Sequence, residues 1–407
     1  MLVNLQQRDF IEFVSLFQVL QKMRLALFFR HFTISRDIFA AILSIASLSA
    51  GSVFSAGVDS AGSGTQDYSF ILDSGNSISV NRVTNTPKLS GKYPDGSEIK
   101  NGYNSASWTQ IEAKWDYNGT TLGLSTGSPY SPHTILYTDG VLTNAGAKVS
   151  SNETAILASR GLGNGMKVFG GIRLNQFKVR TDRPFAGLPA NTTYSVAGGY
   201  TYELDSGTTT GFAIGAAYEM PQIMLRASIQ YNSEIAHKQA KETETIAGTA
   251  ISSSPDDLVA PSSMIIKLRS AVTPRMLAYA NWRSSKYSAL KVTGNNAGGA
   301  GVEGSIYSPT SGTDYVVGLA YKVNDQINLA LATAKGQSTD DGSLANALAP
   351  FQGSSANIIG GSFKVNDNVE INASYALVSY GDANANVITG AGPFENNKGT
   401  RVTIGTK

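Results

Sequence analysis

The chain has 407 residues, among them 42 Gly, 18 Tyr and 16 Phe, and only 15% are charged, which suits a strand-rich protein. The formal net charge of +2 gives no electrostatic basis for nucleic-acid binding, and zero cysteines exclude disulfides, thiolate metal sites and cysteine nucleophiles. The mean hydropathy is close to zero, which argues against a helical membrane bundle. It does not argue against a β-barrel, because a barrel exposes apolar side chains only at alternate positions.

Residues 1–56 are predicted to be an N-terminal extension followed by a signal peptide. Residues 38–50 are uncharged and mostly apolar, and arginines precede them; the run is too short to span a bilayer as a helix. Small residues follow, so we expect cleavage near Ser55 or Ala56. A leader that starts at Met23 has the usual length for a signal peptide. Residues 1–22 are therefore expected to result from the choice of start codon. The alternative for them is an amphipathic helix.

Residues 57–75 are small and polar apart from one apolar stretch, and they show no alternation long enough for a barrel strand. We interpret them as a short hatch or plug in the lumen of a barrel that residues 76–407 form. Phe70, Ile71 and Leu72 are the candidates for apolar contact with a ligand. The alternative is that they fix the plug to the barrel wall.

From residue 76 onward, apolar and polar side chains alternate in run after run, which is the period of β-strands. We count fourteen such runs, an even number. They are residues 78–83, 106–116, a run from 120, a run ending near 160, 166–178, 212–219, 223–232, 264–272, 276–287, four strands of two hairpins within 315–380, and a final run from about 400. A further outer hairpin is expected between Tyr194 and Thr208. The fold class is therefore all-β, a fourteen-stranded antiparallel transmembrane barrel.

One unit is written twice, at residues 316–325 and 358–367, as an apolar run closed by Lys-Val-Asn-Asp. Asn-Asp tolerates the backbone of a tight hairpin turn, so each copy predicts two antiparallel strands. A long polar stretch, residues 336–355, lies between the copies. Short turns that alternate with long loops are typical of an outer-membrane barrel.

Charged residues occupy the same phase of many strands, where a packed core would penalise them and a wet lumen would solvate them. They are Glu112, Lys114, Arg173, Glu219, Arg226, Lys267, Arg269 and Glu370. Of these, Arg226, Lys267 and Arg269 can partner a ligand carboxylate or serve as general charges of the wall. Aromatic residues near strand ends are candidates for interfacial girdles: Tyr117, Tyr218, Tyr231, Trp282, Tyr321, Phe363 and Tyr380.

The third strand is interrupted by Gly127, Pro129, Tyr130 and Pro132. Proline lacks the backbone donor that a ladder needs, so regular pairing cannot continue here. The interruption predicts either a sideways opening in the wall or an ordinary loop after a short strand.

Residues 211–234, the hairpin at 320–325 and the strand count together resemble the FadL-type outer-membrane transporters of long-chain fatty acids and other hydrophobic compounds. The resemblance covers most of the chain from about Asp67. It implies a monomeric barrel plugged by an N-terminal hatch, with a kink in the third strand that opens the wall sideways. Two features depart from the family: the hatch is short and lacks an Asn-Pro-Ala element, and the C-terminus lacks the usual aromatic residue. The final strand is therefore expected to be cut short in this sequence.

The expected function is passive uptake of long-chain fatty acids or other hydrophobic compounds through the outer membrane of a Gram-negative bacterium. The expected partners are these small molecules, outer-membrane lipid and the barrel assembly machinery; no cofactor or metal is expected. A diffusion porin for small hydrophilic solutes is the main alternative, and an adhesin or phage receptor rests only on the long loops. Residues 123–127 match a nucleophile elbow around Ser125, but neither the helix nor the base that this motif needs is evident, so no enzyme is expected.

Overall fold

The structure is a computed structural model that describes residues 66–93, 95–130, 133–183, 199–238, 240–251, 257–299, 302–307, 311–338, 353–383 and 393–407. The expected extension and signal peptide lie outside the described residues, as does the first part of the expected hatch. In the part of the chain that is described, no helix is long and apolar enough to cross a bilayer.

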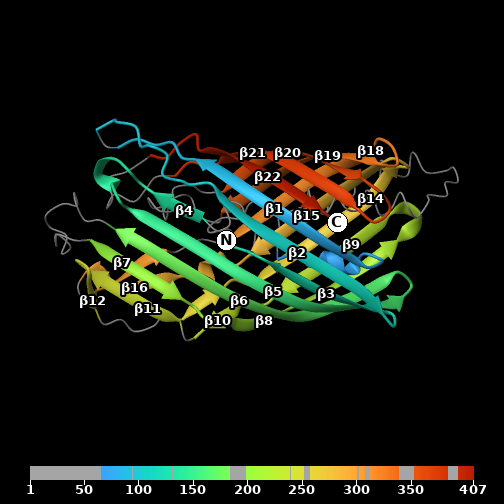
Figure 1. The fold of residues 1–407 in the computed structure, drawn as a ribbon, viewed down its shortest axis with the longest axis horizontal. Coiled ribbons are helices and arrows are strands. Elements are labelled where there is room, and N and C mark those ends of the chain that lie inside the picture. Colours follow the sequence, from blue (N-terminus) through green and yellow to red (C-terminus); the bar gives the residue numbers. More distant parts are fainter. Residues whose placement is uncertain are drawn as a thin grey trace, which may run out of the picture.

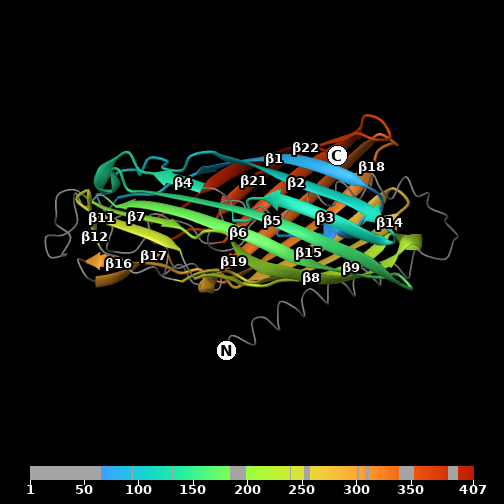
Figure 2. The same ribbon diagram turned by 60° about the horizontal axis from the view of Figure 1, so that its bottom comes forward.

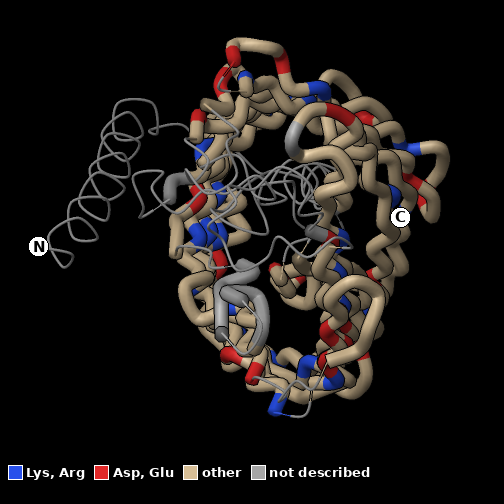
Figure 3. Tube along the Cα trace, turned by 90° about the vertical axis from the view of Figure 1, so that its left-hand side faces the viewer, with Lys and Arg blue, Asp and Glu red and all other residues tan. Residues whose placement is uncertain are grey.

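The strands form a closed antiparallel ring, which Figures 1 and 3 show from the side and from one end. The ring strands are β1 (Ser77–Lys88), β2 (Ala106–Tyr117), β3 (Thr120–Gly127), β5 (Gly146–Gly163), β6 (Met166–Arg183), β8 (Thr209–Met220), β9 (Leu225–Asn232), β14 (Ser263–Thr273), β15 (Met276–Ser285), β18 (Gly312–Lys322), β19 (Ile327–Ser338), β20 (Ser354–Lys364), β21 (Glu370–Tyr380) and β22 (Lys398–Thr406). β22 pairs with both β21 and β1, from Val80 opposite Thr406 to Lys88 opposite Lys398, and this closes the ring. The prediction of a fourteen-stranded barrel is confirmed.

The outer face of the ring is apolar. Large hydrophobic side chains stand exposed around it, such as Ile78 (65%), Leu331 (63%) and Leu377 (57%). A continuous apolar surface of this kind is rare on a water-soluble protein and fits a lipid-facing wall. The opposite phase of the same strands points inward and carries the charged residues that the alternation predicted.

Short turns gather at one end of the barrel and long loops at the other (Figure 1). Asn118 and Gly119 join β2 to β3 with positive φ angles of 50° and 76°, the geometry of a two-residue hairpin turn. The duplicated unit folds alike in both copies: Lys322 pairs with Asp325 at 2.6 Å, and Lys364 pairs with Asp367 at 2.8 Å.

Further strands extend the barrel at its long-loop end. They are β4 (His133–Leu136), β7 (Tyr200–Asp205), β10 (Ile235–His237), β11 (Lys241–Ile246), β12 (Thr249–Ile251), β13 (Leu258–Ala260), β16 (Val292–Gly299) and β17 (Val302–Tyr307). The expected outer hairpin between Tyr194 and Thr208 is wrong in its detail. Its described part is the single strand β7, which pairs with β6 and β11. Of these two partners, β11 lies far along the chain, where local pattern cannot indicate the pairing.

Two expectations about side chains need correction. Tyr380 is only 4% exposed and packs in an inward apolar cluster, so it is not part of a lipid-facing girdle, whereas Tyr117 (65%) and Phe363 (45%) do stand on the outer face. The inward charges are also less solvated than a water-filled lumen implies. Arg173 is fully buried and Arg226 is 6% exposed, because each is paired with carboxylates inside the barrel.

Candidate binding site in the barrel lumen

Residues 66–76, here called the luminal segment, lie inside the barrel and contain the short 3-10 helix η2 (Ser69–Leu72), which is blue in Figures 1 and 2. At the start of the segment, the backbone N–H of Tyr68 donates to Gln230 Oε1 on β9 at 2.9 Å. At its end, Lys114 Nζ on β2 donates to the backbone carbonyls of Asp73 and Ser74 at 2.9 and 3.1 Å, and also to that of Gly75. The segment is therefore held by two wall strands that are not neighbours in the ring.

One carboxylate before η2 and one after it attach the luminal segment to the wall by ion pairs. Asp67 pairs with Lys267 on β14 at 2.5 Å, and Asp73 pairs with Arg226 on β9 at 2.6 Å. Burial raises the pKa of Asp67, but Lys267 and the hydrogen bonds from Ser69 together outweigh burial, and the pKa is lowered. Burial likewise raises the pKa of Asp73, and Arg226 followed by Arg269 lowers it below the usual range. Both carboxyls are thus ionised at neutral pH.

The apolar side of η2 packs against the wall. Ile71 and Leu72 are 0% and 1% exposed, and they share an apolar cluster with Phe169 and Ala217. Gly123 on β3 makes room for this packing, since a Cβ there would lie 2.6 Å from Ile71 Cδ1. Of the two roles considered for Ile71 and Leu72, the structure shows contact with the wall.

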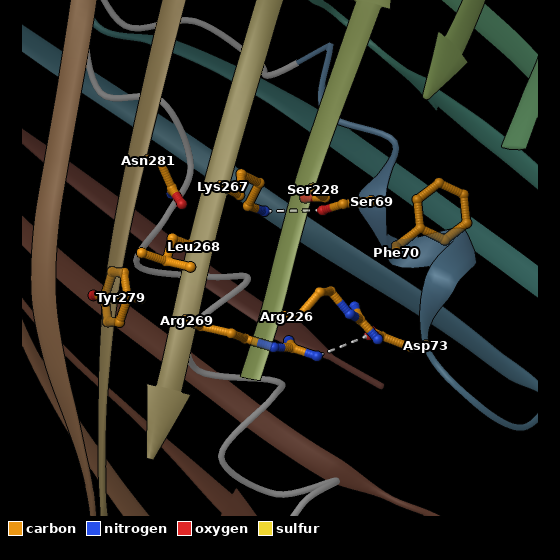
Figure 4. Close-up of a pocket in the computed structure, with 10 residues that line it drawn as sticks. All are labelled: Ser69, Phe70, Asp73, Arg226, Ser228, Lys267, Leu268, Arg269, Tyr279 and Asn281. Carbon is orange, nitrogen blue, oxygen red and sulfur yellow. Dashed lines mark hydrogen bonds and ion pairs between the residues drawn. The ribbon is translucent and has the colours of Figure 1, made fainter. Parts of the chain in front are cut away.

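A small pocket of about 40 Å³ lies between the luminal segment and strands β9, β14 and β15 (Figure 4). Its lining residues are Ser69, Phe70, Asp73, Arg226, Ser228, Lys267, Leu268, Arg269, Tyr279 and Asn281. Four residues singled out from the sequence, Phe70, Arg226, Lys267 and Arg269, thus meet at one place. Ile71 and Leu72 do not line it.

The pocket combines aromatic surface with positive charge. Tyr279 supplies a ring, whereas the ring of Phe70 is turned away from the cationic side chains (Figure 4), toward Gly123 on β3. Lys267 Nζ donates to Ser69 Oγ at 2.9 Å, and Arg269 pairs with Asp73 at the longer distance of 3.8 Å. Such a site can hold the anionic head of an amphiphile beside apolar surface.

The strand ladder is interrupted after β3. Gly127 is its last residue and lies opposite Glu153 on β5. Beyond this pair, residues 106–110 of β2 have a described strand partner only on β1, and residues 150–152 of β5 only on β6. β4 then pairs with β5 further out and resumes the wall. Among the described residues, no strand fills the interval between.

The chain turns inward at this interruption. Tyr130 is 0% exposed, and its ring lies 4.8 Å from that of Phe177, centroid to centroid. Ser151 Oγ accepts from the backbone N–H of Tyr130 and donates to its carbonyl, both at 3.1 Å. Pro129 is buried as well, and Pro132 lies outside the described residues. The wall strand therefore gives way to a segment that points into the lumen.

Several residues of the site were missed in the sequence. Glu153, Gln66, Asp67 and Asp73 bind the luminal segment to the wall. Asp67 and Asp73 were detectable, because they flank the apolar stretch that was singled out. Glu153 has the inward phase of its strand, but its partners come from distant segments and leave no local signal.

The nucleophile-elbow motif does not form the turn that it needs. Ser125 lies within β3, paired on both sides with β2 and β5, rather than at a strand-to-helix turn.

Comparison with known proteins gives the fold. Neither a protein-family model nor a curated protein sequence matches the chain. Among solved structures, a Pseudomonas aeruginosa FadL homologue superposes with a TM-score of 0.61 at 13% identity, covering 81% of this chain and 88% of that one. The Pseudomonas putida toluene transporter TodX superposes with a TM-score of 0.57 at 11% identity, covering 88% of this chain and 98% of that one. The Ralstonia pickettii toluene transporter TbuX superposes with a TM-score of 0.56 at 11% identity, covering 88% of this chain and 97% of that one.

The chain has the FadL-type fold. An even-stranded antiparallel barrel with an apolar outer face and short turns at one end is the architecture of bacterial outer-membrane proteins. The FadL-type barrel described here is therefore an outer-membrane protein. Its luminal segment lies inside the barrel, and its interrupted third strand is part of the wall.

Proposed function

We propose that this barrel takes up hydrophobic compounds, long-chain fatty acids among them, by passive diffusion across the outer membrane, and that they leave the lumen sideways after β3. The observation that carries the proposal is the interrupted ladder at Gly127, close to a lumen that a segment of the chain partly fills. Two of the named structural neighbours, TodX and TbuX, are toluene transporters, in agreement with transport rather than catalysis.

A sideways exit answers an energetic problem. Each CH₂ group that leaves an apolar environment for water costs about 0.8 kcal/mol, so an acyl chain gains nothing from a charged channel that leads to the periplasm. The interval spans five residues on β2 and three on β5, or roughly 17 Å and 10 Å at ~3.4 Å per residue. These lengths are sufficient for an extended chain to pass into outer-membrane lipid.

The pocket supplies a place for the head group before exit. A fatty-acid carboxylate can bind Lys267 or Arg269, while Tyr279 contacts the first carbons. The pocket is too small for a whole acyl chain, so the remainder extends along the lumen. We propose that the protein acts as a monomer after insertion by the barrel assembly machinery.

Uptake of a labelled fatty acid into proteoliposomes tests the exit. Replacing Pro129 and Pro132 by Thr favours continued strand pairing and should reduce uptake several-fold with normal folding. Pro274→Ala, in the short turn between β14 and β15, is the matched control and should leave uptake unchanged. Unchanged uptake in the Pro129→Thr, Pro132→Thr double variant would argue against sideways exit.

Diffusion of small hydrophilic solutes is the second candidate, favoured by the polar inward phase that holds Arg173, Arg226 and Lys267. Swelling of proteoliposomes in sugars separates the two. Rapid, size-limited sugar flux supports the porin, whereas fatty-acid uptake without sugar flux supports the transporter.

A further inference from the structure

Glu153 is a buried junction between the luminal segment and the wall. It is 5% exposed, and its ion pair with the fully buried Arg173 measures 2.8 Å between Oε2 and Nη2. Arg173 Nε reaches Oε1 at 3.1 Å, so the pair is bidentate. Asn175 Nδ2 adds a third wall contact at 3.1 Å. These neighbours hold the carboxylate in one orientation.

The same carboxylate also binds the luminal segment. Tyr68 Oη donates to Oε1, and Gln66 Nε2 lies 3.4 Å from Oε2. Gln66 Nε2 is in addition 2.9 Å from the hydroxyl of Tyr130, the residue that turns inward after β3. The first described residue of the luminal segment thus contacts both Glu153 and the inward turn.

Glu153 lies at the place where the wall is interrupted. Glu153 lies opposite Gly127, at the point where pairing between β3 and β5 stops. Glu153 therefore lies beside the last rung of β3 and contacts the luminal segment directly, and Gln66 connects it to Tyr130. A shift of Gln66 and Tyr68 removes two partners from Glu153 and one from Tyr130.

We propose that Glu153 is a positioning residue that couples the luminal segment to the interrupted wall, so that the seating of Gln66 and Tyr68 keeps the segment around Tyr130 turned inward. The inference rests on the proposed sideways exit, because it assigns control of that exit to the luminal segment. It requires that a change in the luminal segment also changes the wall around Tyr130, which a direct measurement can show.

A single reporter cysteine makes the coupling measurable, since the chain has no cysteine of its own. Ser128→Cys places the thiol on the first residue beyond β3. In proteoliposomes, its rate of reaction with an alkyl maleimide dissolved in the lipid reports how open the wall is at that point. No transported compound is needed for this measurement.

The test variants break the contacts of the luminal segment and leave the Glu153–Arg173 pair intact. Gln66→Leu and Tyr68→Phe should each change the alkylation rate by about fivefold, the factor that corresponds to one hydrogen bond of ordinary strength. Ser69→Ala is the control. Ser69 belongs to the same luminal segment, and the change removes its contact with Lys267 on β14 but no contact with Glu153. Retention of the compact, heat-modifiable form on gels verifies folding. If Gln66→Leu misfolds, Tyr68→Phe, which loses one oxygen only, still tests the coupling.

The outcomes separate the two proposals. Equal alkylation rates in the reporter, Tyr68→Phe and Gln66→Leu proteins would overturn the coupling, as would an equal change in Ser69→Ala. If the rates change as expected but the wild-type protein takes up no fatty acid, the coupling holds and the proposed function fails. If uptake is present and the rates do not respond, the function holds and the coupling fails.

Discussion

The side chain of Ile71 rests directly on the backbone of Gly123, where any Cβ would lie 2.6 Å from Ile71 Cδ1. The luminal segment is thus fitted to a position on β3 that carries no side chain, only four residues before the strand ends. Docking of the segment and the local shape of the third strand depend on each other.

Truncation of Ile71 should loosen the luminal segment. Ile71→Ala removes a fully buried side chain, a change that typically costs about 2–5 kcal/mol. We expect faster hydrogen exchange over residues 66–76 and an unchanged barrel, measured by mass spectrometry. Ile78→Ala is the control, because Ile78 is 65% exposed on the outer face. Equal exchange in both variants would show that the packing on Gly123 does not secure the segment.

Removal of Arg269 should weaken binding of a carboxylate but not of its ester. A hydrogen bond to a charged group contributes about 1.5–3 kcal/mol, so Arg269→Gln should lower the affinity for a long-chain fatty acid roughly 10- to 100-fold. The affinity for the corresponding methyl ester should change little. Calorimetric titration in detergent gives both values, and Arg275→Gln in an exposed turn is the charge-matched control. Parallel losses for acid and ester would contradict an anion site in the pocket.

Acid should release the luminal segment only well below neutral pH. The folded-state pKa values of Asp67 and Asp73 are lowered by Lys267 and Arg226 against the opposing effect of burial. A lowered carboxyl pKa gives stabilisation that is complete above the ordinary value, about 4, and is lost as pH falls through the folded value. Hydrogen exchange of residues 66–76, corrected for the intrinsic rate, should therefore be constant from pH 7 to about 4 and rise below it. A rise that begins near pH 6 would point to another titrating group.

His237 should make the outer strand β10 sensitive to mild acid. Burial lowers the pKa of His237, and its Nε2 lies 3.2 Å from Asn175 Oδ1. Because the opened form then binds a proton more readily than the folded form, packing should weaken as pH falls below about 6.5. Exchange of the backbone amides of β10 measured between pH 7.5 and 5 checks this. His237→Gln should abolish the dependence, and its persistence in that variant would exclude His237 as the cause.

Local pattern was sufficient for the fourteen ring strands, the short turns and the inward phase of the charges. Alternation in β9 is visible residue by residue, and Asn118 and Gly119 mark their turn by themselves, because both properties depend on neighbours in the chain. The same pattern failed for β7, whose partner β11 is separated from it by two ring strands.

The sequence by itself determined that two faces of fourteen strands meet different surroundings, since a period of two fixes which side chains share a face. Only the tertiary structure decided which inward groups meet. Asp73 and Arg226 are 153 residues apart and still form a contact of 2.6 Å, and Glu153 contacts Tyr68 across 85 residues. Such pairs are set by the stagger and tilt with which the ring closes, which no single strand encodes.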